Sequence, residues 1–248
     1  MGTSEKLRPW PLMGPLGVER LVEPISDRDI ELMKNELRDA RTQEDGWHAA
    51  GLLFYMQGIG LGEAITRKDK DLIGKSQQKA DTEGNSLINK DTKDWLSTWM
   101  LFYLHGLGEG GAIIGDDGLM MGKILQKGRV DKDGWEIAWT HFCMHEFDLG
   151  KAVTGKDRDL MGKRLQNERN GKDGGMLALM HFCMHGIGIA ETIPPQDIRL
   201  MKNRLRSERT RKDGWRIAEM HYLLRRLQAF QEAEAALQIP PLKTFGDS

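Results

Sequence analysis

A repeat of about forty residues constrains the fold of this chain more than any other feature. The letters HFCMH stand at 141–145 and return at 181–185, and the similarity extends well beyond them on both sides. One copy matches the others once an insertion around 81–91 is removed. The copies begin at Ile25, Ile65, Ile113, Val153 and Ile193. Each copy of such a repeat folds as one unit that packs against the next copy. The sequence therefore predicts a stack of similar structural units.

Each copy predicts two helices joined by a short turn. The first helix opens with a capping box such as Ser26-x-x-Asp29 and continues with apolar residues at helical spacing. The second opens at Asp-Gly-Trp, as at 45–47, and runs to a Gly-x-Gly pair such as Gly58 and Gly60. Those glycines are expected to end the helix. No strand-like alternation appears, so the predicted fold class is all-α.

We expect these hairpins to form an α-solenoid-like array of five units, with a closed multi-helix bundle as the alternative. The terminal copies depart from the pattern, as end units of an array do. The predicted organisation is an extended arm at 1–24, a helical-repeat domain at 25–233 and a tail at 234–248. The hairpins are expected to start near 25, 65, 113, 153 and 193.

Composition narrows the class of protein. The chain has 248 residues with a net charge of −1 and 39% hydrophobic residues, which is enough for one large core. No apolar run is long enough for a membrane span, so no membrane association is expected. The N-terminus has no continuous apolar segment typical of a secretion signal. We therefore expect a cytoplasmic protein, in which Cys143 and Cys183 are reduced.

The HFCMH motif has a structural and a chemical interpretation. Both histidines of one motif share a helix face and Cys143 points away, so one helix cannot present all three side chains to an ion. Other copies carry Leu53 and Leu101 at the first histidine position, which is typical of packing. We therefore interpret the histidines as packed between helices, with no cofactor. The alternatives are a zinc site or a pH-sensitive seam. Either alternative would use the same four side chains, His141, His145, His181 and His185.

The second helices are apolar on both faces, which indicates either burial on all sides or a groove that an apolar partner fills. Inner helices of open arrays commonly line a concave binding surface. Core or oligomer burial is the favoured interpretation, and the functional alternative is a partner-binding groove. The groove residues would be Tyr55, Trp99, Tyr103, Trp139, Cys143, Met176, Leu179 and Cys183.

The fifth copy is strongly basic. Between 193 and 226 it has ten basic residues against four acidic ones. This excess can hold an acidic protein segment or nucleic-acid phosphates, or can be ordinary solvated charge. The predicted basic patch comprises Arg199, Lys202, Arg204, Arg206, Arg209, Arg211 and Lys212.

Sequence motifs of known enzyme chemistry are absent. GLGEGG at 106–111 lacks the preceding strand that a phosphate-binding loop requires. The leading hypothesis is a non-enzymatic interaction scaffold that binds a protein partner or a second copy of itself. The alternatives are a nucleic-acid-binding repeat that uses the basic patch, a metal-binding protein, and an enzyme working in the groove near Tyr103 and His145.

Overall fold

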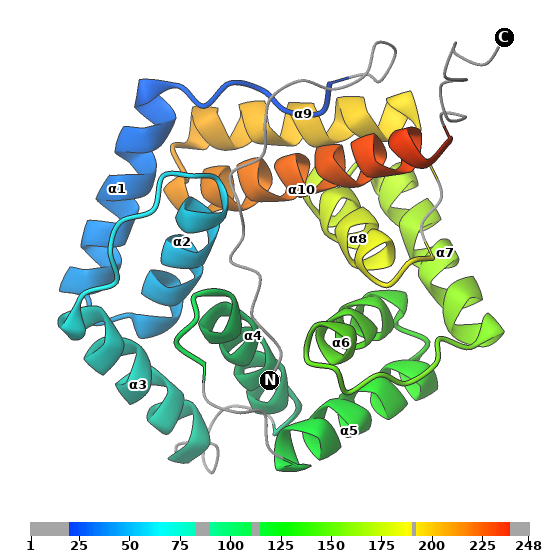
Figure 1. Cartoon of the computed structure of the whole chain (residues 1–248), viewed down its shortest axis with the longest axis horizontal. Helices are drawn as coiled ribbons and strands as arrows, with labels where there is room; N and C mark the ends of the chain where they lie inside the picture. Colours follow the sequence, from blue (N-terminus) through cyan, green and yellow to red (C-terminus); the bar gives the residue numbers. More distant parts are fainter. Residues whose placement is uncertain (1–19, 83–89, 111–114, 190–191, 239–248) are drawn as a thin grey trace, which may run out of the picture.

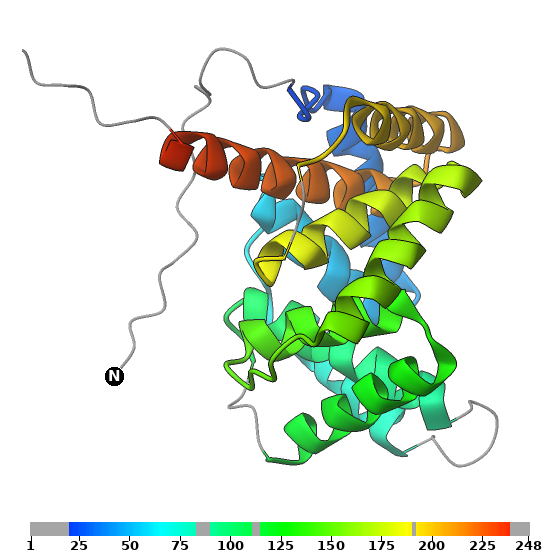
Figure 2. The same ribbon diagram turned by 90° about the vertical axis from the view of Figure 1, so that its right-hand side faces the viewer.

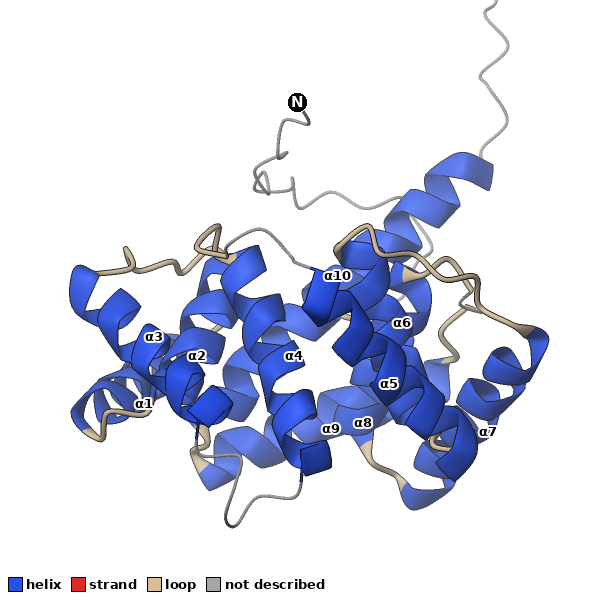
Figure 3. Ribbon diagram, turned by 90° about the horizontal axis from the view of Figure 1, so that it is seen from below, coloured by secondary structure: helices blue, strands red, loops and turns tan. Residues whose placement is uncertain are grey.

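The computed structural model describes residues 20–82, 90–110, 115–189 and 192–238. These ranges contain ten α-helices and no strand, which confirms the all-α prediction (Figure 3). The helices are α1 (Asp27–Thr42), α2 (Gly46–Gly58), α3 (Arg67–Thr82), α4 (Lys90–Gly106), α5 (Gly115–Asp131), α6 (Gly134–Glu146), α7 (Gly155–Gly171), α8 (Gly174–Gly186), α9 (Pro195–Arg211) and α10 (Gly214–Gln238).

Local sequence sets where these helices begin and end. Ser26 and Asp29 form the capping box of α1, and Thr154 and Asp157 form that of α7. Asp45 caps α2 by accepting a hydrogen bond from a backbone amide of the first turn. The same side-chain cap recurs at α6 and α8, whose N-cap residues are Asp133 and Asp173.

The helices form a closed ring of two layers. Figure 1 shows the odd-numbered helices along the outer edge and the even-numbered helices inside them. α10 packs against both α1 and α2, which brings the last hairpin against the first. Trp215 of α10 stacks on Trp47 of α2 with ring centroids 5.0 Å apart. The repeat therefore encloses its own inner layer.

The open α-solenoid-like array expected from the sequence is not confirmed, and the contacts of α10 with α1 and α2 fit the alternative of a closed helical assembly better. The curvature of a repeat array follows from the small rotation between neighbouring units. Five units that turn by similar amounts bring the fifth back to the first, as the contacts of α10 with α1 and α2 show. Closure covers the apolar sides of both end hairpins.

Four of the five inner helices, namely α2, α6, α8 and α10, begin with a glycine that allows close approach to the next outer helix. A Cβ added at Gly134 would lie 2.3 Å from the carbonyl oxygen of Leu160, and one at Gly174 would lie 2.1 Å from that of Leu200. At the ring closure, a Cβ at Gly214 would lie 2.4 Å from the carbonyl oxygen of Leu32. The last junction therefore repeats the packing of the junctions inside the chain.

The segment before α1 and the end of α10 also contribute to the closure. Leu21 is fully buried, and its backbone amide donates a 2.7 Å hydrogen bond to Oε1 of Gln228. α10 has 25 residues where α6 and α8 have 13, and it projects beyond the ring (Figure 2). It continues through the expected start of the tail at 234. The rest of the predicted arm (1–19), the rest of the tail (239–248) and much of the insertion lie outside the described residues.

Candidate interaction surfaces

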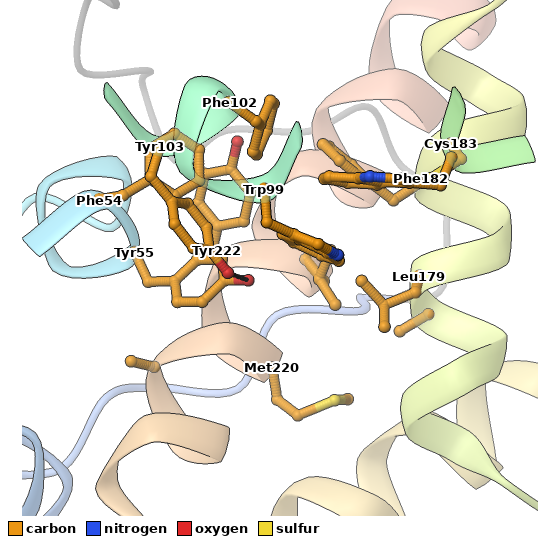
Figure 4. Close-up of a cluster of buried hydrophobic side chains, with 14 of the residues drawn as sticks. Phe54, Tyr55, Trp99, Phe102, Tyr103, Leu179, Phe182, Cys183, Met220 and Tyr222 are labelled. Carbon is orange, nitrogen blue, oxygen red and sulfur yellow. Dashed lines mark hydrogen bonds between the residues drawn. The ribbon is translucent and has the colours of Figure 1, made fainter. Parts of the chain in front are cut away.

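A circle of five aromatic side chains, one from each inner helix, lies at the centre of the inner layer. One residue from each inner helix, at the same place in the repeat, contacts the next around the whole circle. The centroid distances are 4.9 Å for Phe54–Phe102, 5.5 Å for Phe102–Phe142, 4.7 Å for Phe142–Phe182, 5.8 Å for Phe182–Tyr222 and 5.0 Å for Tyr222–Phe54. Figure 4 shows four of the five within the buried cluster. Each side chain therefore contacts its two neighbours around the circle, and all five are buried.

The predicted groove residues lie in the core instead of on a surface. Seven of the eight are buried, and Met176 is partly buried against the same cluster. Trp99 and Trp139 stack with their ring centroids 3.7 Å apart. The apolar second face of the inner helices therefore packs inside the ring, which is the burial that the sequence favoured over a groove. The buried seven are Tyr55, Trp99, Tyr103, Trp139, Cys143, Leu179 and Cys183.

Both thiols belong to this interior. Cys143 and Cys183 are free and have no exposed surface. Burial raises the pKa of each thiol well above its usual range. Because the thiolate is the reactive form, neither cysteine is placed to act as a nucleophile.

A polar network interrupts the aromatic interior near the start of α10. Tyr55 donates a 3.4 Å hydrogen bond to Oε1 of the buried Glu219, and its hydroxyl lies 3.1 Å from that of Tyr103. Arg216 donates a 2.7 Å hydrogen bond to Oε2 of the same carboxylate. Burial raises the pKa of Glu219, and the Arg216 charge opposes this shift. Perturbed groups of this kind mark candidate sites, but a reacting molecule must also reach them.

The first histidine of each HFCMH motif binds an acidic residue sixteen positions later in the chain. Nε2 of His141 lies 3.2 Å from Oδ2 of Asp157, and Nε2 of His181 lies 2.8 Å from Oδ2 of Asp197. The partner is in each case an aspartate in the first turn of the following outer helix. In HYLLR, the corresponding motif of α10, His221 lies 3.4 Å from Oδ2 of Asp29, across the ring closure.

The second histidines of the two motifs have different surroundings. His145 is exposed, whereas His185 is buried and stacks on Phe230 at a centroid distance of 5.5 Å. Burial lowers the pKa of His185 to about 4, and the His181 charge adds to this shift. Within the described ranges, no group of three or more His, Cys, Asp or Glu side chains is placed to hold a metal ion.

The same aspartates also bind an arginine from the preceding outer helix. Nε of Arg129 donates a 2.9 Å hydrogen bond to Asp157, and Arg169 binds Asp197 in the same way. Each pair joins residues 28 positions apart, from the last turn of one outer helix to the first turn of the next. Arg41 and Asp69 repeat the pair between α1 and α3. This recurrent pair was not predicted from the sequence, although its fixed spacing is visible in the repeat.

The predicted basic patch is largely occupied by contacts within the chain. Arg209 binds Asp29 and Glu23, and Arg206 also reaches Glu23 at 3.3 Å. Arg204 and Arg211 both lie against the buried carboxylate of Glu208. Arg199 and Lys212 are exposed, and Lys202 is partly exposed. Much of the positive charge therefore serves ring closure and the packing of α9.

The outer helices form the exposed layer, and α5 differs from the rest. Leu119 has 59% of its surface exposed and Val130 has 70%, and they are the exposed large hydrophobic residues of the described chain. Neither residue was predicted from the sequence to lie on a binding surface. The signal was present, because the aligned positions of the following copy are Asp159 and Asn170.

Among the described residues, no helix is both long and apolar enough to cross a membrane. No protein-family model matches the chain, and no curated protein or solved structure matches it either.

Proposed function

We propose that the protein is a non-enzymatic scaffold whose closed ring presents its outer helices to another protein or to a second copy of itself. The observation that carries this proposal is the filled interior. The aromatic circle and the groove residues are buried against each other, so the exposed layer is left to make external contacts. Aromatic interior packing also makes the ring rigid, which suits a surface that must keep its shape on binding.

The burial of the most perturbed groups supports a non-enzymatic role. Tyr55 and Tyr103 have 2% and 1% of their surface exposed, and burial raises the pKa of both well above the ordinary tyrosine value. Their network with Glu219 is explained by the need to satisfy polar groups inside the ring. Arg216, at the rim, is the one member of this network with a substantially exposed side chain, at 46%.

The experiment is to isolate the untagged protein under mild conditions from the cells that produce it and to measure the mass of the eluted species by light scattering. We expect a mass larger than that of one chain, contributed by a partner or by a second copy. The same preparation is then titrated with duplex oligonucleotide at low and high salt, with Arg206→Glu as the comparison variant.

Two results would contradict the scaffold. One is a single chain at all concentrations that binds oligonucleotide with a steep salt dependence lost in Arg206→Glu, which would favour the nucleic-acid alternative. The other is stoichiometric zinc by elemental analysis, lost together with His145 or His185, which would favour the metal alternative.

A further inference from the structure

The exposed hydrophobic residues of α5 lie on one face of the helix. Eleven positions separate Leu119 from Val130, which is close to three full turns at 3.6 residues per turn. Met121, Ile124 and Leu125 on the opposite side are buried against the ring. The two exposed side chains therefore point the same way, outward from the ring.

The ring itself does not require apolar residues at these places. The positions aligned with Leu119 in the other copies are all charged and exposed, and those aligned with Val130 in the first, fourth and fifth copies are polar and exposed. The aligned residues are Glu31, Asp71, Asp159 and Arg199 for the first place and Thr42, Asn170 and Thr210 for the second. Leu119 and Val130 thus expose apolar area that the fold tolerates but does not use.

Between these two residues the surface of α5 is low enough for another helix to approach. Gly122 lies one turn after Leu119, and a Cβ there would meet only the Nζ atom of Lys151, at 3.3 Å. Lys123 and Gln126 are exposed on the same side. We call this surface the α5 outer face, and it comprises Leu119, Gly122, Lys123, Gln126 and Val130.

We propose that the α5 outer face binds the same face of a second copy of this chain, with the two helices antiparallel. The proposal rests on the scaffold function and names its partner. A two-fold axis that passes midway between Leu119 and Val130 places each Leu119 against Val130 of the other copy.

Charge favours this antiparallel arrangement. Exposed Asp116 lies at the N-terminal end of α5, and exposed Lys132 follows its C-terminal end. Antiparallel pairing brings Asp116 of one copy close to Lys132 of the other, at both ends of the contact. The carboxylates on either side of Lys132 are engaged within the chain, Asp131 in an ion pair with Lys127 and Asp133 as the N-cap of α6. Opposed helix dipoles add to the preference.

The first test compares the wild-type chain with Leu119→Asp/Val130→Asn by light scattering and analytical ultracentrifugation. Each substitution introduces the residue that α7 carries at the aligned place, so the ring is expected to keep its helix content and thermal midpoint. We expect a wild-type dimer whose dissociation constant rises on the order of 100-fold or more in the variant, because two apolar contacts are lost from each copy. Asp159→Ala/Asn170→Ala on α7 is the matched control and leaves the dimer unchanged.

The second test locates the two-fold axis. Gln126→Cys places a thiol close to its counterpart in the other copy, and a short bis-maleimide reagent is expected to join the two chains. Gln166→Cys, at the aligned place on α7, is not expected to cross-link. The natural cysteines are fully buried and do not compete.

Three results would overturn the proposal: a monomeric wild-type chain, a dimer that survives Leu119→Asp/Val130→Asn, or equal cross-linking of the two cysteine variants. A dimer lost on removal of residues 2–19 but retained in Leu119→Asp/Val130→Asn would assign the contact to the N-terminal segment. A recombinant monomer that nevertheless forms a complex in its native cells would reject the second copy and leave the scaffold function standing.

Discussion

Arg209 binds Asp29 across 180 residues of chain in the way that Arg129 binds Asp157 across 28. In both pairs the guanidinium comes from the last turn of an outer helix, and the carboxylate lies in the first turn of the next outer helix around the ring. Burial alone raises the pKa of Asp29, but hydrogen bonds from Arg209 and Ser26 outweigh this and lower it to about 2. The junction without a covalent link is therefore closed by the same chemistry as the others.

Arg209→Met is expected to destabilise the ring strongly. The change leaves the Asp29 carboxylate buried without its cation, which typically costs about 3–5 kcal/mol. The free energy of unfolding, measured in urea at neutral pH, should fall by an amount of that order. Arg199→Met on the exposed side of α9 is the control and should change it by less than about 0.5 kcal/mol. Equal effects of the two variants would show that the Arg209 pair does not hold the closure.

Replacement of glycine by alanine should have opposite effects on stability at Gly186 and at Gly162. A Cβ at Gly186 would lie 2.6 Å from two ring carbons of Phe142, so Gly186→Ala is expected to cost about 1–3 kcal/mol by overpacking. A Cβ at Gly162, in the exposed middle of α7, would meet no atom within 4 Å. Gly162→Ala should therefore stabilise the protein by about 0.5–1 kcal/mol through its helix propensity.

Thermal and urea unfolding of both glycine variants measure this difference. Phe142→Leu is expected to relieve part of the cost of Gly186→Ala, because it shortens the side chain that the new methyl group meets. Additive losses in the double variant would mean that Gly186 is required for another reason.

Stability is expected to fall as the pH is lowered from about 6.5 to 4. Burial lowers the pKa of His221 to about 4, although the neighbouring Asp29 opposes the shift. An unfolded histidine has a pKa of about 6.5, so between these values the unfolded state binds more protons and acid favours it. His185, whose pKa is also lowered to about 4, contributes in the same direction.

His221→Leu should flatten this pH dependence. Leu53 occupies the same place in the first copy and is buried there, so the ring accommodates leucine at this position. The free energy of unfolding is measured from pH 4 to 7.5 for the wild type and the variant. His145→Leu, at an exposed histidine, is the control. An unchanged slope in His221→Leu would exclude this histidine as a source of the acid sensitivity.

The helices were predictable from local sequence, whereas ring closure was not. Capping boxes and Asp-Gly starts act within one turn, so their chemistry is visible in a short stretch such as Ser26–Asp29. Closure depends on the rotation between neighbouring hairpins, which is set by many contacts between the layers. The repeated Arg–Asp spacing gave a signal, because Arg209 has an expected partner that no later copy supplies.

The sequence could not separate a groove from a buried interior for a related reason. A helix that is apolar on two faces has the same sequence pattern whether it lines a groove or lies inside a ring. Tyr103 and Trp139 were therefore candidates for a binding surface as well as for the core, and closure buries both. The residues that do distinguish a surface, Leu119 and Val130, were recognisable only by their departure from the charged and polar residues of the other copies.

A circular permutant gives a direct test of closure. The new chain begins at Lys151 and ends at Gly150, in the exposed connection between α6 and α7, and a flexible linker joins Ser248 to Met1. The junction between Arg129 and Asp157 then lacks its covalent link, while the one between Arg209 and Asp29 gains a link. Because both junctions use the same contacts, we expect the same helix content and a single cooperative unfolding transition.

Hydrogen exchange should show the difference between the permutant and the wild type, since the first turn of a helix at an unlinked junction opens most easily. Fast-exchanging amides should move from the first turn of α1 in the wild type to the first turn of α7 in the permutant. A permutant that keeps its fast exchange at α1, or fails to fold, would show that the closing junction is not equivalent to the others.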